Sequence, residues 1–212
     1  MDVLSDSDKK DVTVESIAQK ALKDKKALLE LLQGILSKDD AIRFSSFKVL
    51  LLLSEKHPEA LYDKWGFFAD LLDSDNSYLQ YIAIYIMANL TKADTQNRFE
   101  KIFNKYYSIL DDDSTITAAH LASNSGKIAK AKPGLQDKIT AKLLNIDRNH
   151  HGKQKDLIKG YAIEALSEYF EEAENRNEIL EFVKAQLASK SPKTRKIAKE
   201  FLRKWAKSAN ST

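Results

Sequence analysis

Cysteine is absent from the 212 residues, and proline (3) and glycine (6) are scarce. A chain without cysteine has no disulfides, no thiolate zinc sites and no cysteine nucleophile. Sheet-rich folds need many turns, so few prolines and glycines favour long helices joined by short connections. The longest apolar runs, residues 49–53 and 81–90, are far shorter than the roughly 20 residues of a membrane span.

The first twelve residues are acidic and lack an apolar core, so they do not have the pattern of a signal peptide. Since the chain also has no cysteine to form disulfides, we expect an intracellular, cytoplasmic protein. The net charge of +3 is too small to indicate a nucleic-acid partner by itself. No membrane contact is expected, and a monomer is favoured.

Apolar residues recur with helical spacing along most of the chain, which is 43% hydrophobic and 31% charged. Leu28, Leu31, Leu32 and Ile35 show the spacing i, i+3, i+4, i+7. No segment is apolar all round, so each expected helix must bury one face against its neighbours.

A repeat of about 37 residues follows from four similar helix ends. Leu36, Leu72, Leu110 and Leu187 each precede a short turn rich in Ser and Asp, at spacings of 36, 38 and 77 residues. The longest spacing is about two repeats, and the missing member falls near Leu144. This period is typical of stacked helix pairs.

Turn chemistry sets the expected helix boundaries. Asp39, Ser77 and Ser114 can cap the next helix, and Pro58 and Pro192 fit first-turn positions. We expect a helix over 13–23 and five pairs: 25–37 with 40–56, 58–73 with 77–91, 95–110 with 115–132, 135–146 with 155–172, and 175–189 with 192–207. Residues 1–11 and 209–212 are expected to be disordered, and 12–208 to form one repeat domain.

The second helices carry a degenerate V-R-x-x-A-x-x-x-L pattern, and on it residues 25–207 resemble the HEAT-repeat (HEAT/armadillo-like) family. The matching residues are Ile42, Arg43, Ser46 and Leu50, then Lys159, Ala162 and Leu166, then Thr194, Arg195, Ala198 and Leu202. The second repeat, residues 58–91, lacks the arginine. The resemblance implies an all-α, α-α superhelix of about five helix pairs plus an N-terminal helix, with the second helices on its inner face. It implies no chemistry, and a compact helical bundle is the alternative.

The segment 115–134 has few large apolar residues. On a helical wheel its small residues, such as Ala118, Ala122 and Ser125, form one stripe that suits close packing. His120, Asn124 and Lys127 fall on the opposite side. They form either a polar partner-binding surface or an ordinary solvated face.

The C-terminal segment 190–207 holds eight basic residues and one acidic residue, whereas 168–181 is strongly acidic. Lys196, Lys199 and Arg203 lie on the basic face of the expected last helix. This face is either a solubilising cap, neutralised by the acidic neighbour, or a site for an acidic partner or a phosphate backbone. The connection 147–154 has no apolar residue and is expected to be exposed and cleavable.

No catalytic, metal or cofactor site is predicted. The four histidines form no HExxH, and neither a glycine-rich phosphate loop nor GxSxG occurs. We therefore predict a non-enzymatic binding scaffold that holds a protein or peptide partner. The alternative is a nucleic-acid-binding protein that uses the basic C-terminal helix. A HEAT-like DNA glycosylase ranks below both, because its Trp, Asp and Arg trio cannot be assembled here.

Overall fold

The computed structural model describes residues 13–205, which form helices and no strand. Packing divides the chain after Thr95 into two compact units, unit 1 and unit 2. The expectations for residues 1–11, for Lys207 and for the tail 209–212 lie outside the described residues. The single repeat domain over 12–208 stays a prediction.

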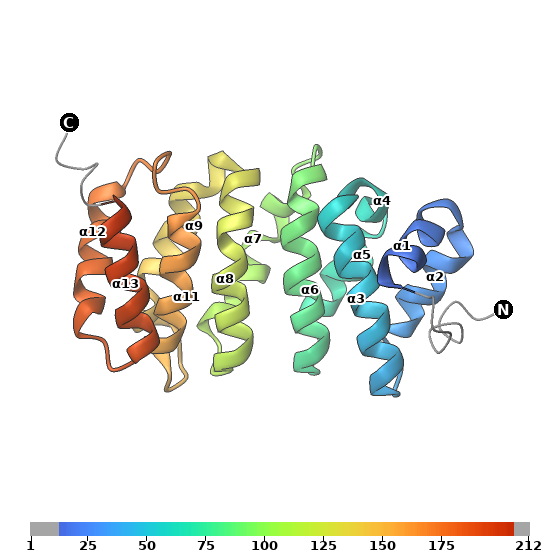
Figure 1. Ribbon diagram of the computed structural model, residues 1–212, viewed down its shortest axis with the longest axis horizontal. Helices are drawn as coiled ribbons and strands as arrows, with labels where there is room; N and C mark the ends of the chain where they lie inside the picture. The colour runs from blue at the N-terminus through green and yellow to red at the C-terminus, as the bar shows by residue number, and fades with distance from the viewer. Residues whose placement is uncertain (1–12, 206–212) are drawn as a thin grey trace. The chain divides into compact units, whose positions relative to one another are not determined.

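Residues 13–95 of unit 1 form six α-helices and two short 3-10 turns (Figure 1). They are α1 (Val14–Lys23), α2 (Lys25–Gly34), α3 (Asp40–Lys56), α4 (Pro58–Tyr62), α5 (Trp65–Asp70), η2 (Leu71–Asp73), α6 (Ser77–Leu90) and η3 (Thr91–Ala93). Asp39 caps α3 as predicted, accepting from the backbone N–H groups of Ala41 at 2.8 Å and Ile42 at 3.2 Å. The predicted cap at Ser77 is wrong, because the preceding Asn76 accepts from Tyr78 N–H and Ser77 is already helical.

The helix predicted over 58–73 is interrupted. Lys64 has φ −96° and ψ 12°, outside the helical range, and separates α4 from α5. The apolar spacing survives the break, since Leu61, Trp65 and Phe68 are all buried. Apolar periodicity reports burial on one side of the chain, so it does not reveal a short interruption of this kind.

The described part of unit 2, residues 96–205, forms seven α-helices and two 3-10 turns. They are α7 (Arg98–Asp111), α8 (Thr115–Ala131), η4 (Pro133–Leu135), α9 (Gln136–Leu144), α10 (Ile146–Asn149), α11 (Lys155–Ser167), α12 (Arg176–Ala185), η5 (Gln186–Ala188) and α13 (Pro192–Trp205). Within this unit α8, α11 and α13 form one row, in which α11 packs between the other two (Figure 1). Helices α7, α9 and α12 pack against this row.

The two arginines of the HEAT-like pattern have the same structural role in the two units. Arg43 Nη1 donates to the carbonyl of Ser37 at 3.0 Å. Arg195 Nη1 donates to the carbonyl of Ser189 at 2.6 Å. Each guanidinium therefore satisfies a carbonyl in the turn before its own helix, six residues back along the chain. In the second helical repeat, which lacks the arginine, Gln80 Nε2 donates instead to the carbonyl of Leu72 at 3.3 Å.

The small-residue stripe of α8 is buried as predicted and allows close contact with α11. A Cβ atom on Gly126 would lie 2.8 Å from the carbonyl oxygen of Ala165 and 2.7 Å from the carboxyl of Glu168. Only glycine fits at this distance, because a backbone oxygen cannot move aside as a flexible side chain can.

The connection 147–154 is not the open loop that its polar sequence predicts. His150 is 1% exposed, and its Nδ1 lies 3.0 Å from the carbonyl of Leu110. The backbone N–H of His151 donates to the carbonyl of Asp111 at 3.1 Å. The connection thus satisfies carbonyls that α7 leaves open at its C-terminus, although Arg148 and Lys153 remain exposed.

Candidate functional site

The row of α8, α11 and α13 in unit 2 holds all the predicted site residues that the structure describes. His120, Asn124 and Lys127 lie on α8, and Lys196, Lys199 and Arg203 lie on α13. Because α11 packs between these two helices, the structure does not bring the two sets together.

The α8 set does not form one exposed patch. Asn124 is 2% exposed, so the expectation that it faces water is wrong. The exposed side of α8 is centred on Ile116 and Ser123, and Asn124 lies about 80° around the helix from Ile116. Its Nδ2 donates to the carbonyl of His120 at 2.9 Å, which satisfies one half of the buried amide.

His120 and Lys127 are half-buried. Burial lowers the pKa of His120 below its ordinary value, because the charged imidazolium is less well solvated there. His120 therefore presents a neutral ring at pH 7, which suits a polar contact better than a charged one.

Polar contacts fix α13 against α11 at the N-terminal end of both helices. Thr194 Oγ1 donates to the carbonyl of Asp156 at 2.6 Å, and the Lys190 N–H donates to the Asp156 carboxylate at 2.7 Å. The Asp156 carboxylate also pairs with buried Lys159 Nζ at 2.8 Å. The hydrogen bond from Lys159 is the main reason that the pKa of Asp156 is lowered.

Two further contacts fix the same helices along their length. The indole N–H of Trp205 donates to Ser167 Oγ at 3.0 Å. Lys193 Nζ lies 3.6 Å from the centre of the Tyr161 ring, a cation–π contact. These contacts therefore fix the exposed face of α11 relative to the exposed face of α13.

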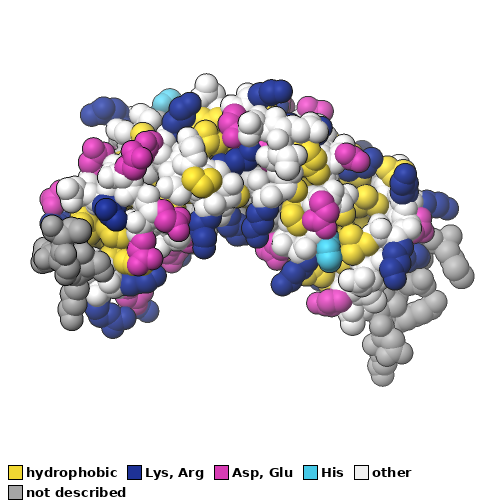
Figure 2. All heavy atoms as spheres, turned by 90° about the horizontal axis from the view of Figure 1, so that it is seen from above, with side chains coloured by type: hydrophobic (Ala, Val, Ile, Leu, Met, Phe, Trp, Pro, Cys, Tyr) yellow, Lys and Arg dark blue, Asp and Glu magenta, His cyan; other side chains and the backbone are white. Residues whose placement is uncertain are grey.

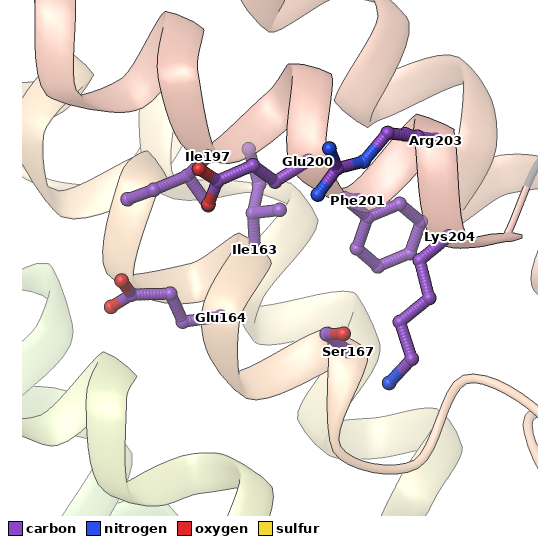
Figure 3. A pocket seen from close by; sticks show the side chains of 8 residues that line it. All are labelled: Ile163, Glu164, Ser167, Ile197, Glu200, Phe201, Arg203 and Lys204. Atoms are coloured by element: carbon purple, nitrogen blue, oxygen red, sulfur yellow. The ribbon is translucent and has the colours of Figure 1, made fainter.

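Between α11 and α13 lies a groove of about 540 Å³, called the α11–α13 groove below (Figure 3). It is lined by Ile163, Glu164, Ser167, Ile197, Glu200, Phe201, Arg203 and Lys204. The apolar side chains lie between the two helices, and the charged ones lie around them. This is the usual composition of a peptide groove, with an apolar floor and a polar rim.

The charges around the groove are separated by sign. Glu164 and Glu200 lie toward the Ile197 end, whereas Arg203 and Lys204 lie one turn further along α13 (Figure 3). Glu200 pairs with Lys196 only at a long 4.0 Å. Within the described residues Glu164 and Arg203 have no ionic partner, so both charges are available to a ligand.

The basic face of α13 points away from the core. Lys196, Lys199 and Arg203 are exposed. Lysines and arginines (dark blue) and acidic residues (magenta) are interspersed over the face in Figure 2.

Sequence reasoning missed the α11 side of the groove. A signal exists, because Leu157, Tyr161, Glu164 and Glu168 follow a helical spacing and are at least partly exposed on α11. The juxtaposition with Phe201 and Arg203, however, arises only from tertiary packing. Among residues 13–205, no cluster of three His, Asp or Glu residues is arranged to hold a metal ion. None of the helices in that range is long and apolar enough to cross a membrane.

Neither a protein-family model nor a curated protein matches the sequence. Solved structures do match the fold. An engineered protein has a TM-score of 0.57 at 16% identity, over 91% of this chain and 83% of that chain. A designed armadillo repeat protein in complex with the peptide (KR)4 has a TM-score of 0.56 at 14% identity, over 90% of each chain. The chain therefore has an all-α, armadillo/HEAT-like helical repeat fold, as its sequence predicts.

Proposed function

We propose that the protein is a non-enzymatic, cytoplasmic scaffold that holds a peptide segment of a protein partner in the α11–α13 groove. The observation that carries this proposal is the groove itself, with its apolar floor and its charges of opposite sign at the two ends. Stacked helix pairs commonly present such extended surfaces to peptides and helices.

The chemistry of the groove defines its occupant. A bulky apolar side chain of the partner packs on Ile197, the partly exposed apolar residue of the lining, above the buried Ile163 and Phe201. A basic side chain beside it meets Glu164 and Glu200, and an acidic side chain meets Arg203 and Lys204. Because both ends are exposed, the charges contribute more to orientation and selectivity than to affinity.

The fold comparison supports peptide binding as a use of this architecture. The designed armadillo repeat protein of similar fold is in complex with (KR)4, a peptide of basic residues alone. The α11–α13 groove carries charges of both signs, so the partner that we propose differs from that peptide. On the far side of α11, His120 and Lys127 extend the surface to α8, and a longer segment would reach them.

A charge swap tests the proposal. The probe is a labelled mixed-charge peptide, with a central Leu between a Lys and a Glu, made in both sequence orders. Of these two peptides, one is expected to bind. We expect Glu164→Lys to lower the affinity for that peptide by about tenfold, as measured by fluorescence anisotropy. Replacing the peptide Lys by Glu should restore binding to this variant.

Two controls make the result specific. Glu178→Lys makes the same charge change on the exposed surface of α12 and should leave binding within about twofold. A peptide with Ala in place of the central Leu should bind weakly to every variant. Equal binding of the mixed-charge, charge-swapped and Ala peptides to the unaltered protein would refute the proposal.

A further inference from the structure

Among the cations on the outer face of α13, only Lys196 has an acidic partner within residues 13–205. Lys199 and Arg203 form no ion pair within residues 13–205, and Lys196 reaches only Glu200, at 4.0 Å. Lys193 lies on the Tyr161 ring and Lys204 on the Trp205 ring, so neither charge is neutralised by a carboxylate. The helix therefore presents a strongly positive surface to solvent.

The acidic segment before α13 does not neutralise this surface by direct pairing. Within this segment Glu181 pairs with Lys184 at 2.7 Å, and Arg176 Nη1 donates to the backbone carbonyl of Glu171 at 2.9 Å. The suggestion that the acidic and basic segments neutralise each other is thus not realised as ion pairs with the exposed α13 cations.

The outer face of α13 is also free of apolar side chains. The apolar residues Ala198, Phe201 and Trp205 are buried, and Phe201 and Trp205 both pack on Phe170, at ring distances of 5.1 and 5.5 Å. A helix that binds a membrane surface needs an outward apolar face, and protein interfaces need an apolar core. Binding to a phosphate backbone requires neither, because counterion release drives it.

The spacing of the cations suits a linear polyanion. Lys196, Lys199 and Arg203 lie within about 60° of one another around the helix, with rises of about 4.5 and about 6 Å between successive residues. They form a row along one edge of α13. Lys193 beside the row has the same charge, whereas the exposed Glu200, about 40° around the helix from Lys196, has the opposite one. Successive phosphates of a nucleic acid can meet such a row one after another.

We propose that this cation row of α13 binds the phosphate backbone of nucleic acid. Neither an aromatic side chain nor an amide lies within the row, so binding reads no base sequence and includes no stacking on single-stranded bases. The proposal is separate from peptide binding in the α11–α13 groove, although Arg203 borders both. Lys196 and Lys199 distinguish the two sites, because neither lines the groove.

The test is a titration of labelled duplex DNA and duplex RNA into the full chain, followed by fluorescence anisotropy. We expect sequence-independent binding at low salt, whose affinity falls with salt with a log–log slope of about −3 on duplex DNA, about 0.9 for each of three to four phosphates. Lys196→Glu/Lys199→Glu should weaken binding at least about tenfold and reduce the slope by about 2. The same double variant should bind the mixed-charge peptide as the unaltered protein does.

Lys101→Glu/Lys138→Glu is the matched control, because both lysines are exposed outside α13 and the change in net charge is the same. It should change the affinity less than about twofold. Equal losses in the two double variants would show general electrostatic attraction and overturn the proposal. Tighter binding of a poly-glutamate peptide, or of anionic vesicles, than of duplex would also overturn it, in favour of an acidic protein or a membrane.

Discussion

Helices α8 and α13 are both second helices of their repeats, yet they pack by different means. Helix α8 buries ten residues, among them four alanines and one glycine, and packs closely on α11. Helix α13 buries only four residues, and two of these are Phe201 and Trp205. The packing of α8 is limited by its close approach to α11, whereas α13 is held by a few large side chains.

The difference matters for function. Close packing leaves only a narrow strip of α8 exposed, and Asn124 already lies outside that strip. Little of the helix is therefore available to a partner. On α13, by contrast, Lys193, Lys196, Lys199, Arg203 and Lys204 are exposed, and the α11–α13 groove opens beside it. The ability to bind is therefore expected at α13 more than at α8.

The largest effect is expected from shortening a large side chain on α13. Phe201→Ala removes a ring that is 3% exposed and packs edge-on against Phe170. The lost burial and the cavity should lower the free energy of unfolding by about 3–5 kcal/mol. Urea denaturation followed by circular dichroism measures the change, and a loss below about 1 kcal/mol would mean that α13 is not held by its aromatic residues.

On α8, adding a side chain rather than removing one should lower stability. Gly126→Val places a side chain against the Ala165 carbonyl, and overpacking of this kind lowers stability by about 1–3 kcal/mol. Gly66→Ala is the control, because no atom lies within 4 Å of the added carbon. That substitution should be neutral or stabilise by up to about 1 kcal/mol. Stabilisation by both changes would show that α8 and α11 are not in close contact.

A smaller effect is expected from a buried hydrogen bond of α8. Ser125 Oγ donates to the Leu121 carbonyl at 3.0 Å and accepts from the Tyr107 hydroxyl at 3.1 Å. Tyr107→Phe leaves the serine satisfied, so the expected loss is about 1 kcal/mol. Ser125→Ala would leave the buried Tyr107 hydroxyl without its acceptor, so it should lower the free energy of unfolding by more. Thermal denaturation of both variants measures the two losses. The reverse order would contradict this assignment of donor and acceptor.

The smallest effect concerns pH. Because burial lowers the pKa of His120, the unfolded chain binds more protons than the folded chain as the pH falls below about 6.5. The contribution of His120 to stability is complete above that pH and decreases toward the lower pKa of the folded state. His120→Gln should therefore reduce the loss of stability between pH 7 and pH 5. An unchanged pH dependence would show that this imidazole titrates as in the unfolded chain.

Local signals in the sequence predicted the helix pairs, the cap at Asp39 and the prolines that begin α4 and α13. Each depends on chemistry within a few residues. The failures need tertiary information. His150 lies in a polar segment, and its burial results from contact with the end of α7, some 40 residues earlier.

The candidate site was predicted only in part for the same reason. The basic residues of α13 follow from a helical wheel, and their exposure agrees with it. The wheel of α8 placed Asn124 among exposed residues, because it cannot show how wide the exposed strip is. The groove combines Glu164 of α11 with Phe201 and Arg203 of α13, and no local spacing relates residues so far apart.

Photo-crosslinking tests the central claim, peptide binding in the α11–α13 groove, most directly. Benzoylphenylalanine is placed at residue 164 beside the groove or, as a control, at residue 178 on α12, and the peptide concentration is raised to offset the loss of the Glu164 charge. After irradiation with the labelled mixed-charge peptide, we expect a crosslink from residue 164 that excess unlabelled peptide suppresses, and almost none from residue 178. Equal crosslinking from both positions, or crosslinking from residue 164 that unlabelled peptide does not suppress, would contradict the account.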